Sequence, residues 1–324
     1  MRIISRRIVV MTAIAMIIPV VAISQLANSN SAGGRAGAAM RMGFGARGLA
    51  MGNAMTSVIN GDVQSYYNPA VVPFETEPTF AVTYGILSLD RKLNYLSYTK
   101  NLKPNAGFSL SIINAGVGNI DGYDRNAVQT GTLSTSENAF LLSFGLKPAE
   151  KFSLGVSVKV LYYSLYESVK STTAGVDVGA LYLLSQEWTL GAVVQDITAK
   201  YKWDTSKLYG QFGNTTAEYF PLRKRAGITW MPKEYPVMLT GEVEAIGSAV
   251  FLRAGSELKI SEGVYVRGGL DQIAVNNDVP AKPALGLSVQ TKVGTWTPSF
   301  QYAYVFEPYS PSGLHILSIV LRFQ

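Results

Sequence analysis

Residues 152–163 read FSLGVSVKVLYY, and this stretch decides the fold of the chain. Apolar side chains occupy every second position from Phe152 to Tyr162, while small or polar residues such as Ser157 and Lys159 stand between them. A repeat of two residues is typical of a β-strand whose two faces meet different surroundings. The stretches AFLLSFGLK, TAGVDVGALYLL and WTPSFQYAYVF repeat the pattern, so the sequence predicts an all-β protein.

Strand-like segments continue from residue 79 to the end of the chain. We expect about fourteen of them, near residues 79–86, 92–100, 106–113, 138–147, 152–163, 173–184, 188–196, 223–231, 236–244, 249–259, 263–271, 282–291, 295–306 and 314–324. Short turns at NLKPNA, PAEK, SQE, PKEYP, SEG and KVG each join an even-numbered segment to the next odd one. Longer connections, notably residues 114–137 and 197–222, fall between odd segments and the following even ones.

This sorting of short and long connections predicts a transmembrane up-and-down antiparallel β-barrel of about fourteen strands. In an outer-membrane barrel the short turns lie in the periplasm and the longer loops lie outside the cell. The barrel closes because hydrocarbon has no water to satisfy the backbone groups of a sheet edge. Aromatic residues near strand ends are expected at the membrane interfaces: Tyr162, Tyr163, Tyr166, Trp188, Trp203, Trp230, Tyr235, Trp296, Tyr302, Tyr304 and Tyr309.

The composition excludes several classes of function. The 324 residues are 48% hydrophobic and 15% charged, with no cysteine and one histidine. Without cysteine there is no disulfide framework, thiolate metal site or lipidated cysteine. The net charge of +6 falls to +3 when Arg2, Arg6 and Arg7 are left out, and no basic patch with interleaved aromatic residues remains. We therefore expect no nucleic-acid partner, no metal and no cofactor.

Residues 1–29 have the layout of a secretory signal peptide. A basic start, MRIISRR, precedes an apolar stretch of about sixteen residues and then small residues, with Ser24, Ala27 or Ser29 as possible cleavage points. The alternative is a retained anchor helix, for which this stretch is short. No later segment offers eighteen consecutive apolar residues, so we expect the mature chain to reside in the membrane through its strands.

Residues 30–78 precede the first strand and contain GARGLAMGNAMTSVINGDVQSYYNPA at Gly45 to Ala70. A fourteen-stranded barrel encloses a lumen that its own wall side chains cannot fill. We expect residues 30–78 to fold back into the lumen of the barrel, residues 79–324, as a plug. Glycines would permit tight turns and close backbone approach, and Asn68-Pro69 would set an extended turn. The alternative is an unstructured periplasmic leader.

The same stretch resembles the N-terminal signature of the PorV/PorQ family, and it is similar to the hatch of FadL-type transporters. The residues that match are Gly45, Ala46, Arg47, Gly52, Asp62, Asn68, Pro69 and Ala70. The last strand-like segment matches at His315, Ser318, Arg322 and Phe323. Two departures are Asn53, where glycine is usual, and the residues SYY before the Asn-Pro-Ala. The C-terminal segment also resembles the strand signal by which the insertion machinery recognises barrels, apart from the extra Gln324.

The resemblance implies a FadL-like barrel that is not an enzyme. PorV/PorQ proteins bind the signal domains of proteins secreted by the type IX system, or hold a partner at the surface, and residues 114–137 and 197–222 would make those contacts. The alternative is a FadL-like transporter of hydrophobic molecules through a gap in the wall, which needs an apolar pocket at the plug and an unpaired strand. An enzyme is the third class. The lone His315 has no catalytic partner in the sequence and is expected in the wall or a loop near the outer rim.

Charged residues recur on one face of three neighbouring segments. In PVMLTGEVEA, VFLRAGSELKI and VYVRGGLDQ the apolar residues are expected to face lipid, which turns the charged ones towards the lumen: Glu242, Glu244, Arg253, Glu257, Lys259, Arg267 and Asp271. An Arg or Lys facing lipid at mid-depth would cost roughly 2 to 4 kcal/mol. Around the SEG turn we expect Glu257 to oppose Arg267, and Arg253 to oppose Asp271. This ladder would brace the barrel and hold the plug, or would line a path for a polar permeant.

Overall fold

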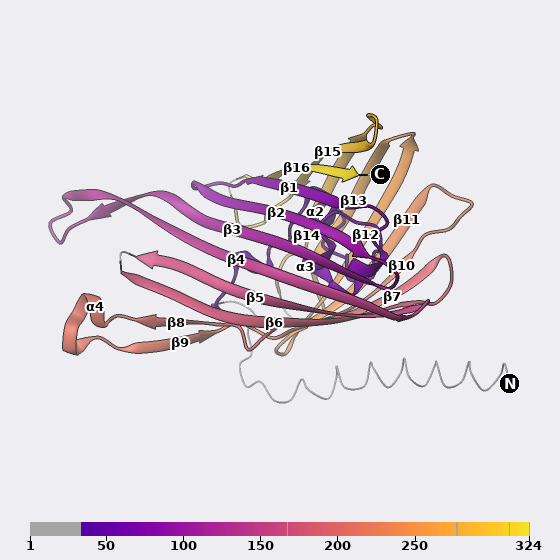
Figure 1. Ribbon diagram of the computed structural model, residues 1–324. Coiled ribbons are helices and arrows are strands. Elements are labelled where there is room, and N and C mark those ends of the chain that lie inside the picture. The colour runs from indigo at the N-terminus through magenta and orange to yellow at the C-terminus, as the bar shows by residue number, and fades with distance from the viewer. Residues whose placement is uncertain (1–33, 167, 277, 311, 324) are drawn as a thin grey trace.

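The computed structural model describes residues 34–323 apart from residues 167, 277 and 311, so the expected signal peptide lies outside the described residues. Fourteen strands form a closed antiparallel barrel, as the sequence predicted, and β1 pairs with β16 to close it (Figure 1). The barrel strands are β1 (Thr79–Ile86), β2 (Arg91–Leu102), β3 (Ala106–Tyr123), β4 (Gln129–Ala149), β5 (Phe152–Tyr166), β6 (Val169–Leu183), β7 (Trp188–Ile197), β10 (Arg223–Trp230), β11 (Val237–Ile246), β12 (Ala249–Ser261), β13 (Val264–Ala274), β14 (Lys282–Gln290), β15 (Trp296–Val305) and β16 (Leu314–Phe323).

The outer face of the barrel is apolar. On β5, Leu154, Val156, Val158 and Val160 are 39–48% exposed on the outside, while the residues between them are buried towards the lumen. In a closed sheet the strands satisfy one another's backbone hydrogen-bonding groups, and the outward band places apolar side chains against the lipid tails of a membrane. None of the helices in the described part of the chain is long and apolar enough to cross a membrane.

The two rims differ as predicted. The six short turns all lie on one rim, hereafter the short-turn rim, together with the end of β16. The opposite rim, the long-loop rim, carries a hairpin and a ribbon that extend well past the other strands (Figure 1). The hairpin is formed by β3 and β4, and the ribbon by β8 (Lys200–Asp204) and β9 (Thr215–Tyr219), which are joined through α4 (Ser206–Tyr209) and η4 (Gly210–Phe212).

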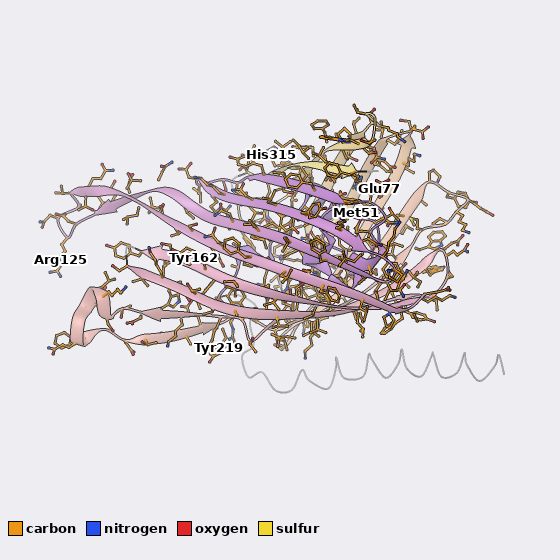
Figure 2. All side chains as sticks on the ribbon, in the orientation of Figure 1. Met51, Glu77, Arg125, Tyr162, Tyr219 and His315 are labelled. Carbon is orange, nitrogen blue, oxygen red and sulfur yellow. The ribbon has the colours of Figure 1, made fainter. Side chains whose placement is uncertain are left out.

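The expectation that residues 114–137 form a loop was wrong. The β3–β4 ladder continues through most of this stretch, with Ile120 paired to Leu133, and only residues 124–128 turn the chain. The ribbon within residues 197–222 was also missed. Outside the membrane both faces of a strand meet water, so the apolar repeat that reveals a wall strand is absent there. Figure 2 shows Arg125 at the far end of the hairpin and Tyr219 on the ribbon.

Most of the expected interfacial aromatic residues stand at strand ends, but two do not belong to an interfacial girdle. Tyr163 lies on the inward face of β5. Trp203, on strand β8 of the ribbon, is buried, with its ring 5.3 Å from the Tyr163 ring. Tyr201 and Phe220 complete this inward aromatic cluster. On the short-turn rim, Trp188 and Trp230 stack at 5.8 Å.

The segment before β1 fills the lumen as the predicted plug. It consists of η2 (Ala39–Arg41), α2 (Ala46–Ala50), α3 (Gln64–Tyr67) and η3 (Pro69–Phe74), and Figure 1 shows α2 and α3 among the strands of the wall. Most of its side chains are buried. Asn68 is extended, as expected, but the chain does not leave the plug there: Asn68 caps η3, and the chain reaches the wall only after Glu75.

Wall glycines receive the plug backbone. A Cβ atom added to Gly155 would overlap the backbone of Pro69 and Ala70, and one added to Gly191 would overlap that of Thr56. We call the inward wall glycines that touch the plug the glycine belt: Gly107, Gly145, Gly155, Gly179, Gly191, Gly255, Gly269 and Gly286. Each permits a backbone approach that a side chain would prevent. These eight glycines lie on eight different strands, so the plug is seated by direct contact with at least eight strands of the wall.

The sequence left open whether the pair Gly268-Gly269 marks a bend in a strand. In the structure the two glycines lie on opposite faces of β13. Both residues pair regularly with β12, and the two register shifts lie elsewhere, between Leu252 and Ala254 and between Lys259 and Ser261. A Cβ on Gly269 would overlap the backbone of the plug, whereas the nearest atom to a Cβ on Gly268 would be 3.8 Å away.

Gly269→Ala should therefore unseat the plug, with a loss of about 1–3 kcal/mol in the free energy of unfolding, because packed backbone has to move. Gly268→Ala, the adjacent residue on the outer face, is the control and should change stability by less than about 0.5 kcal/mol. Thermal unfolding in detergent and single-channel conductance in planar bilayers measure the two effects. Equal behaviour of the two variants would contradict the role assigned to the belt.

Candidate functional site

A network of buried charges links the wall to the plug. Arg253 on β12 lies among three carboxylates and forms ion pairs with Glu242, Glu244 and Asp271, all buried on the lumen side. Glu257 pairs with Arg267 across β12 and β13 at 2.5 Å. The structure thus brings six of the seven charged residues that were singled out in the sequence into two groups, one around Arg253 and one formed by Glu257 and Arg267.

The sequence analysis missed two members of this network. Arg223 and Arg225 lie on β10, where Arg223 Nε donates to Glu244 at 2.6 Å and Arg225 Nε donates to Glu242 at 2.5 Å. Their spacing of two residues in RKRAGITW was the available signal, since it places both on the same face of a strand. Lys259 shares the lumen-side alternation but is exposed at the short-turn rim, without an ion pair among the described residues.

The plug signature and the C-terminal signature contact each other and the network. Arg47 donates two hydrogen bonds to Glu257, at 2.7 and 2.9 Å, in a bidentate arrangement that holds α2 against the wall. Asp62 accepts hydrogen bonds from Arg322 and from Gln301, and the backbone N–H of Ala46 donates to Ser318 Oγ at 2.9 Å.

Polar side chains of the plug also provide hydrogen-bond partners for its buried polar groups. Asn53, the departure from glycine, adopts φ 59°, a left-handed conformation that asparagine tolerates. Its amide donates to Asp271 at 2.8 Å and its oxygen accepts from the Tyr67 hydroxyl at 2.7 Å. Asn68 donates to the Thr56 carbonyl at 2.8 Å and accepts from the N–H of Ala70 at 3.0 Å.

The remaining signature residues have other positions. Gly45 precedes α2 at φ 79°, and Gly52 lies against the backbone of β13 at φ 61°. His315 points outwards from the wall, where the Tyr302 hydroxyl is 2.7 Å from its Nδ1 atom (Figure 2). Phe323 packs 5.4 Å from the Trp296 ring at the short-turn rim. Neither His315 nor Phe323 belongs to the buried network.

The wall ladder is interrupted beside β6. β7 pairs with β6 only as far as Ile197, and beyond that point β8 lies along β6 without joining its sheet. Two side chains bridge the two segments: Thr173 Oγ1 donates to the carbonyl of Lys200, and the N–H of Lys202 donates to Ser171 Oγ at 2.8 Å. We call this junction the β6–β8 seam. Below it, on the lumen side, Lys159 pairs with Asp177 at 2.7 Å and also with Asp196.

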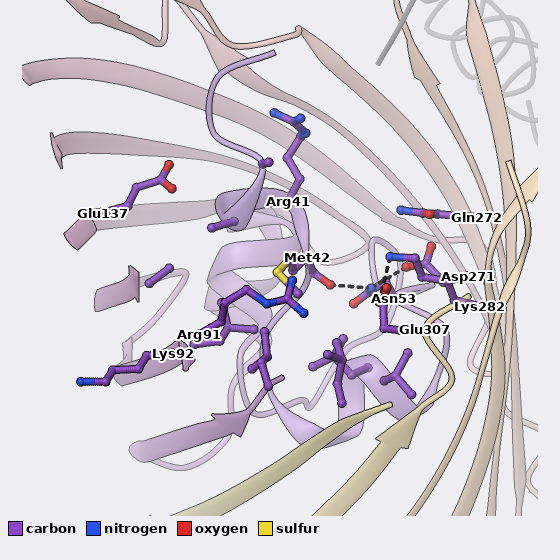
Figure 3. A pocket seen from close by; sticks show the side chains of 18 of the residues that line it. Arg41, Met42, Asn53, Arg91, Lys92, Glu137, Asp271, Gln272, Lys282 and Glu307 are labelled. Atoms are coloured by element: carbon purple, nitrogen blue, oxygen red, sulfur yellow. Dashed lines mark hydrogen bonds and ion pairs between the residues drawn. The ribbon is translucent and has the colours of Figure 1, made fainter. Parts of the chain in front are cut away.

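Above the plug, the barrel opens into a cavity of about 590 Å³, hereafter the vestibule (Figure 3). Its floor includes Met42, Leu49 and Asn53 of the plug, and the surrounding strands contribute apolar side chains such as Phe251 and Leu314. The described residues hold no group of three or more histidine or acidic side chains that could bind a metal ion.

Two cations at the vestibule have no carboxylate partner within the described ranges. Arg41 reaches up from the plug and donates to the carbonyl of Ala36, and Arg91 donates to Ser88 (Figure 3). Lys92 follows Arg91 on β2, but it lies on the outward face of the strand, opposite the exposed Ile86, and points away from the cavity (Figure 3). Burial and the nearby Arg223 guanidinium lower the pKa of Arg41 below its usual value. These cations differ from those of the buried network, whose charges are matched.

Comparisons with known proteins find the fold and leave the sequence family open. No protein-family model matches the sequence, and no curated protein does. Among solved structures, the toluene transporter TodX of Pseudomonas putida superposes with a TM-score of 0.60 at 13% identity over 86% of this chain and 96% of that one. The toluene transporter TbuX of Ralstonia pickettii gives 0.62 at 13% over 87% and 99%. A FadL homologue of Pseudomonas aeruginosa gives 0.55 at 11% over 86% and 96%.

The chain has the fold of FadL-type barrels. With its closed ladder and apolar outer face, it is an outer-membrane protein. These neighbours are transporters and a FadL homologue, and none of them supports the narrower resemblance to PorV/PorQ.

Removing the central guanidinium should damage the network severely. Arg253→Met leaves Glu242, Glu244 and Asp271 short of a partner, and breaking a buried pair from one side costs about 3–5 kcal/mol. Lys292→Met, at an exposed position without an ion pair in the described chain, is the control and should cost less than about 0.5 kcal/mol. Urea unfolding in detergent measures both, and a loss below 1 kcal/mol for Arg253→Met would show that the network is dispensable.

Proposed function

We propose that, after removal of residues 1–29, the chain works as an outer-membrane transporter that receives small amphipathic molecules with an anionic head in its vestibule. The observation that carries this proposal is a 590 Å³ cavity that combines apolar walls with two cations, Arg41 and Arg91, that lack carboxylate partners in the described chain. Ligand sites are typically mostly apolar cavities with a few convergent polar groups, and this volume lies in their range.

The charges argue for an amphipathic cargo rather than a bare hydrocarbon. An apolar ligand would cover Arg41 without offering it a hydrogen-bond acceptor, and a buried cation without a partner is costly. A carboxylate would accept charge-assisted hydrogen bonds from Arg41 and Arg91, while its tail would lie against Met42, Leu49 and Phe251. The solved toluene transporters share the fold, but the proposed cargo rests on the side chains of this chain.

The route past the plug is also part of the proposal. The glycine belt closes the centre of the lumen, so a molecule in the vestibule has to displace part of the plug or leave sideways. The β6–β8 seam supplies the unpaired strand that a lateral route requires, because only side-chain hydrogen bonds bridge it in the described chain. Separating the ribbon from β6 would break fewer main-chain hydrogen bonds than opening any regular pair of strands.

The test uses decanoate and decanol, which share a tail and differ in charge. Proteoliposomes that contain the protein should accumulate labelled decanoate faster than empty ones. The double variant Arg41→Gln, Arg91→Gln should bind decanoate about 10-fold or more weakly, because two charge-assisted contacts are lost, and should bind decanol nearly unchanged. Arg125→Gln, at the tip of the hairpin, is the control. Uptake equal to that of empty liposomes would overturn the proposal.

A second candidate function is binding of a secreted signal domain or a surface partner, as the PorV/PorQ resemblance implies. The observation in its favour is that the β3–β4 hairpin and the β8–β9 ribbon project beyond the barrel (Figure 1). Residues 129–134 of β4 and all of β9 are exposed. An exposed pair of long strands offers edges and faces to a protein partner.

For this candidate, we expect a shortened hairpin to lose the partner and keep the barrel. Replacing residues 118–134 with Asn-Gly preserves the Val117–Thr135 pair and closes the strands with a favoured two-residue turn. A purified secretion-signal domain should be retained by the intact protein and lost by this variant, at an unchanged melting temperature. Lys151→Gln, at an exposed position on the opposite, short-turn rim, is the control and should retain the domain. No retention by the intact protein would exclude this function for that domain.

A further inference from the structure

Lysine side chains gather on the outer surface of the β6–β8 seam. Lys170 of β6 is exposed and shares the outward face with Val178, which is 46% exposed to the surroundings of the barrel. On the ribbon, Tyr201 and Trp203 are buried inwards, so the alternating residues Lys200 and Lys202 face outwards.

These three lysines stand on adjoining stretches of β6 and β8. The hydrogen bond from the N–H of Lys202 to Ser171 Oγ sets Lys202 beside Lys170 across the seam, and the contact between Thr173 and the carbonyl of Lys200 sets Lys200 one step lower. Figure 1 shows β8 running alongside β6. Like charges on neighbouring strands repel each other, so this arrangement favours an anion between them.

The cluster lies at a defined height in the membrane. Tyr162 on β5 pairs with Thr172 on β6, and the next outward residue on β6 is Lys170. Two residues along a tilted strand rise about 5 Å, which places Lys170 just beyond the aromatic position and next to the headgroups. Below it, Val158 and Val160 face the hydrocarbon.

Acidic side chains of the described residues do not neutralise the cluster: Lys170, Lys200 and Lys202 form no ion pair among them. The ammonium group of Lys200 lies over the Tyr219 ring, 5.5 Å from its centroid, in a cation–π contact that leaves its charge without a carboxylate. Asp204, the nearest outward carboxylate on β8, accepts hydrogen bonds from Ser206 at the tip.

We propose that Lys170, Lys200 and Lys202 form a binding site for the phosphate groups of a phosphorylated outer-leaflet lipid, held at the β6–β8 seam. The phosphate oxygens would accept hydrogen bonds from the ammonium groups, and the acyl chains would lie along the apolar band of β5 and β6 below. Such a lipid would bridge the two segments where the backbone ladder is missing. The site lies on the outer surface of the barrel and does not depend on the cargo proposed for the vestibule.

The test is a titration of the purified full chain in neutral detergent with diphosphorylated lipid A, followed by native mass spectrometry. The triple variant Lys170→Gln, Lys200→Gln, Lys202→Gln should bind at least about 20-fold more weakly, since each cation near an anionic surface is worth roughly a fivefold change in affinity. The control Lys103→Gln, Lys151→Gln, Lys292→Gln removes three exposed lysines from the short-turn rim and should change the affinity less than twofold.

Three results would overturn the proposal. Equal weakening in the control variant would mean general electrostatic attraction, equal binding of dephosphorylated lipid A would mean recognition of acyl chains alone, and competition by inorganic phosphate at the concentrations of lipid A would mean a site for soluble anions. If the triple variant melts at a lower temperature than the intact protein, the single variants Lys170→Gln and Lys202→Gln replace it, each with an expected loss of about fivefold.

Discussion

The structure depends on direct contact between the plug backbone and glycines of the wall. A barrel of fourteen strands has a lumen wider than its own inward side chains can fill, and a chain that enters this space brings backbone groups that need partners. The glycine belt lets the plug lie close enough for wall side chains to provide those partners, as when Ser153 Oγ donates to the Ala70 carbonyl at 2.5 Å. The wall and the plug therefore form one packed unit.

The buried charges make the seating of the plug specific. Burial of hydrophobic surface alone would hold a plug in several orientations, because it has no direction. The bidentate contact of Arg47 with Glu257 and the contact of Asp62 with Arg322 fix both ends of the plug signature. A buried ion pair adds little net stability, but a mismatched one is costly, so shifted positions of the plug are penalised. The ion-paired charges lie at the level of the plug, which forms the floor of the vestibule, and the cations without carboxylate partners lie above that floor.

The two ends of the described plug signature and the last strand meet because β16 closes the barrel against β1. Residues some 270 positions apart, such as Ala46 and Ser318, become hydrogen-bonded neighbours through this closure. One side of the wall departs from regular pairing, at the β6–β8 seam, and there side chains replace the ladder. The interior of the molecule is thus rigidly specified, while its adaptable part faces the membrane and the long-loop rim.

The sequence by itself determined the barrel, its strand count and the orientation of its charged faces, because a strand in a membrane wall must alternate between lipid and lumen. This is why the register of Glu257 opposite Arg267 followed from the SEG turn alone. Arg223 and Arg225 obeyed the same alternation and were overlooked, whereas Tyr163 was assigned to an interface although its odd position places it inwards. The hairpin extension and the ribbon were hidden, since water on both sides removes the repeat.

Only the tertiary structure decided which partners these residues have. Three features depend on segments that are far apart in the chain. Gly269 receives the plug instead of bending a strand, Asn53 can stand where glycine is usual, and Lys170 lies next to Lys202. Periodicity reports on the medium that a side chain faces, which is a local property. It carries no information on which distant backbone fills the space, because that follows from closure and packing of the whole chain.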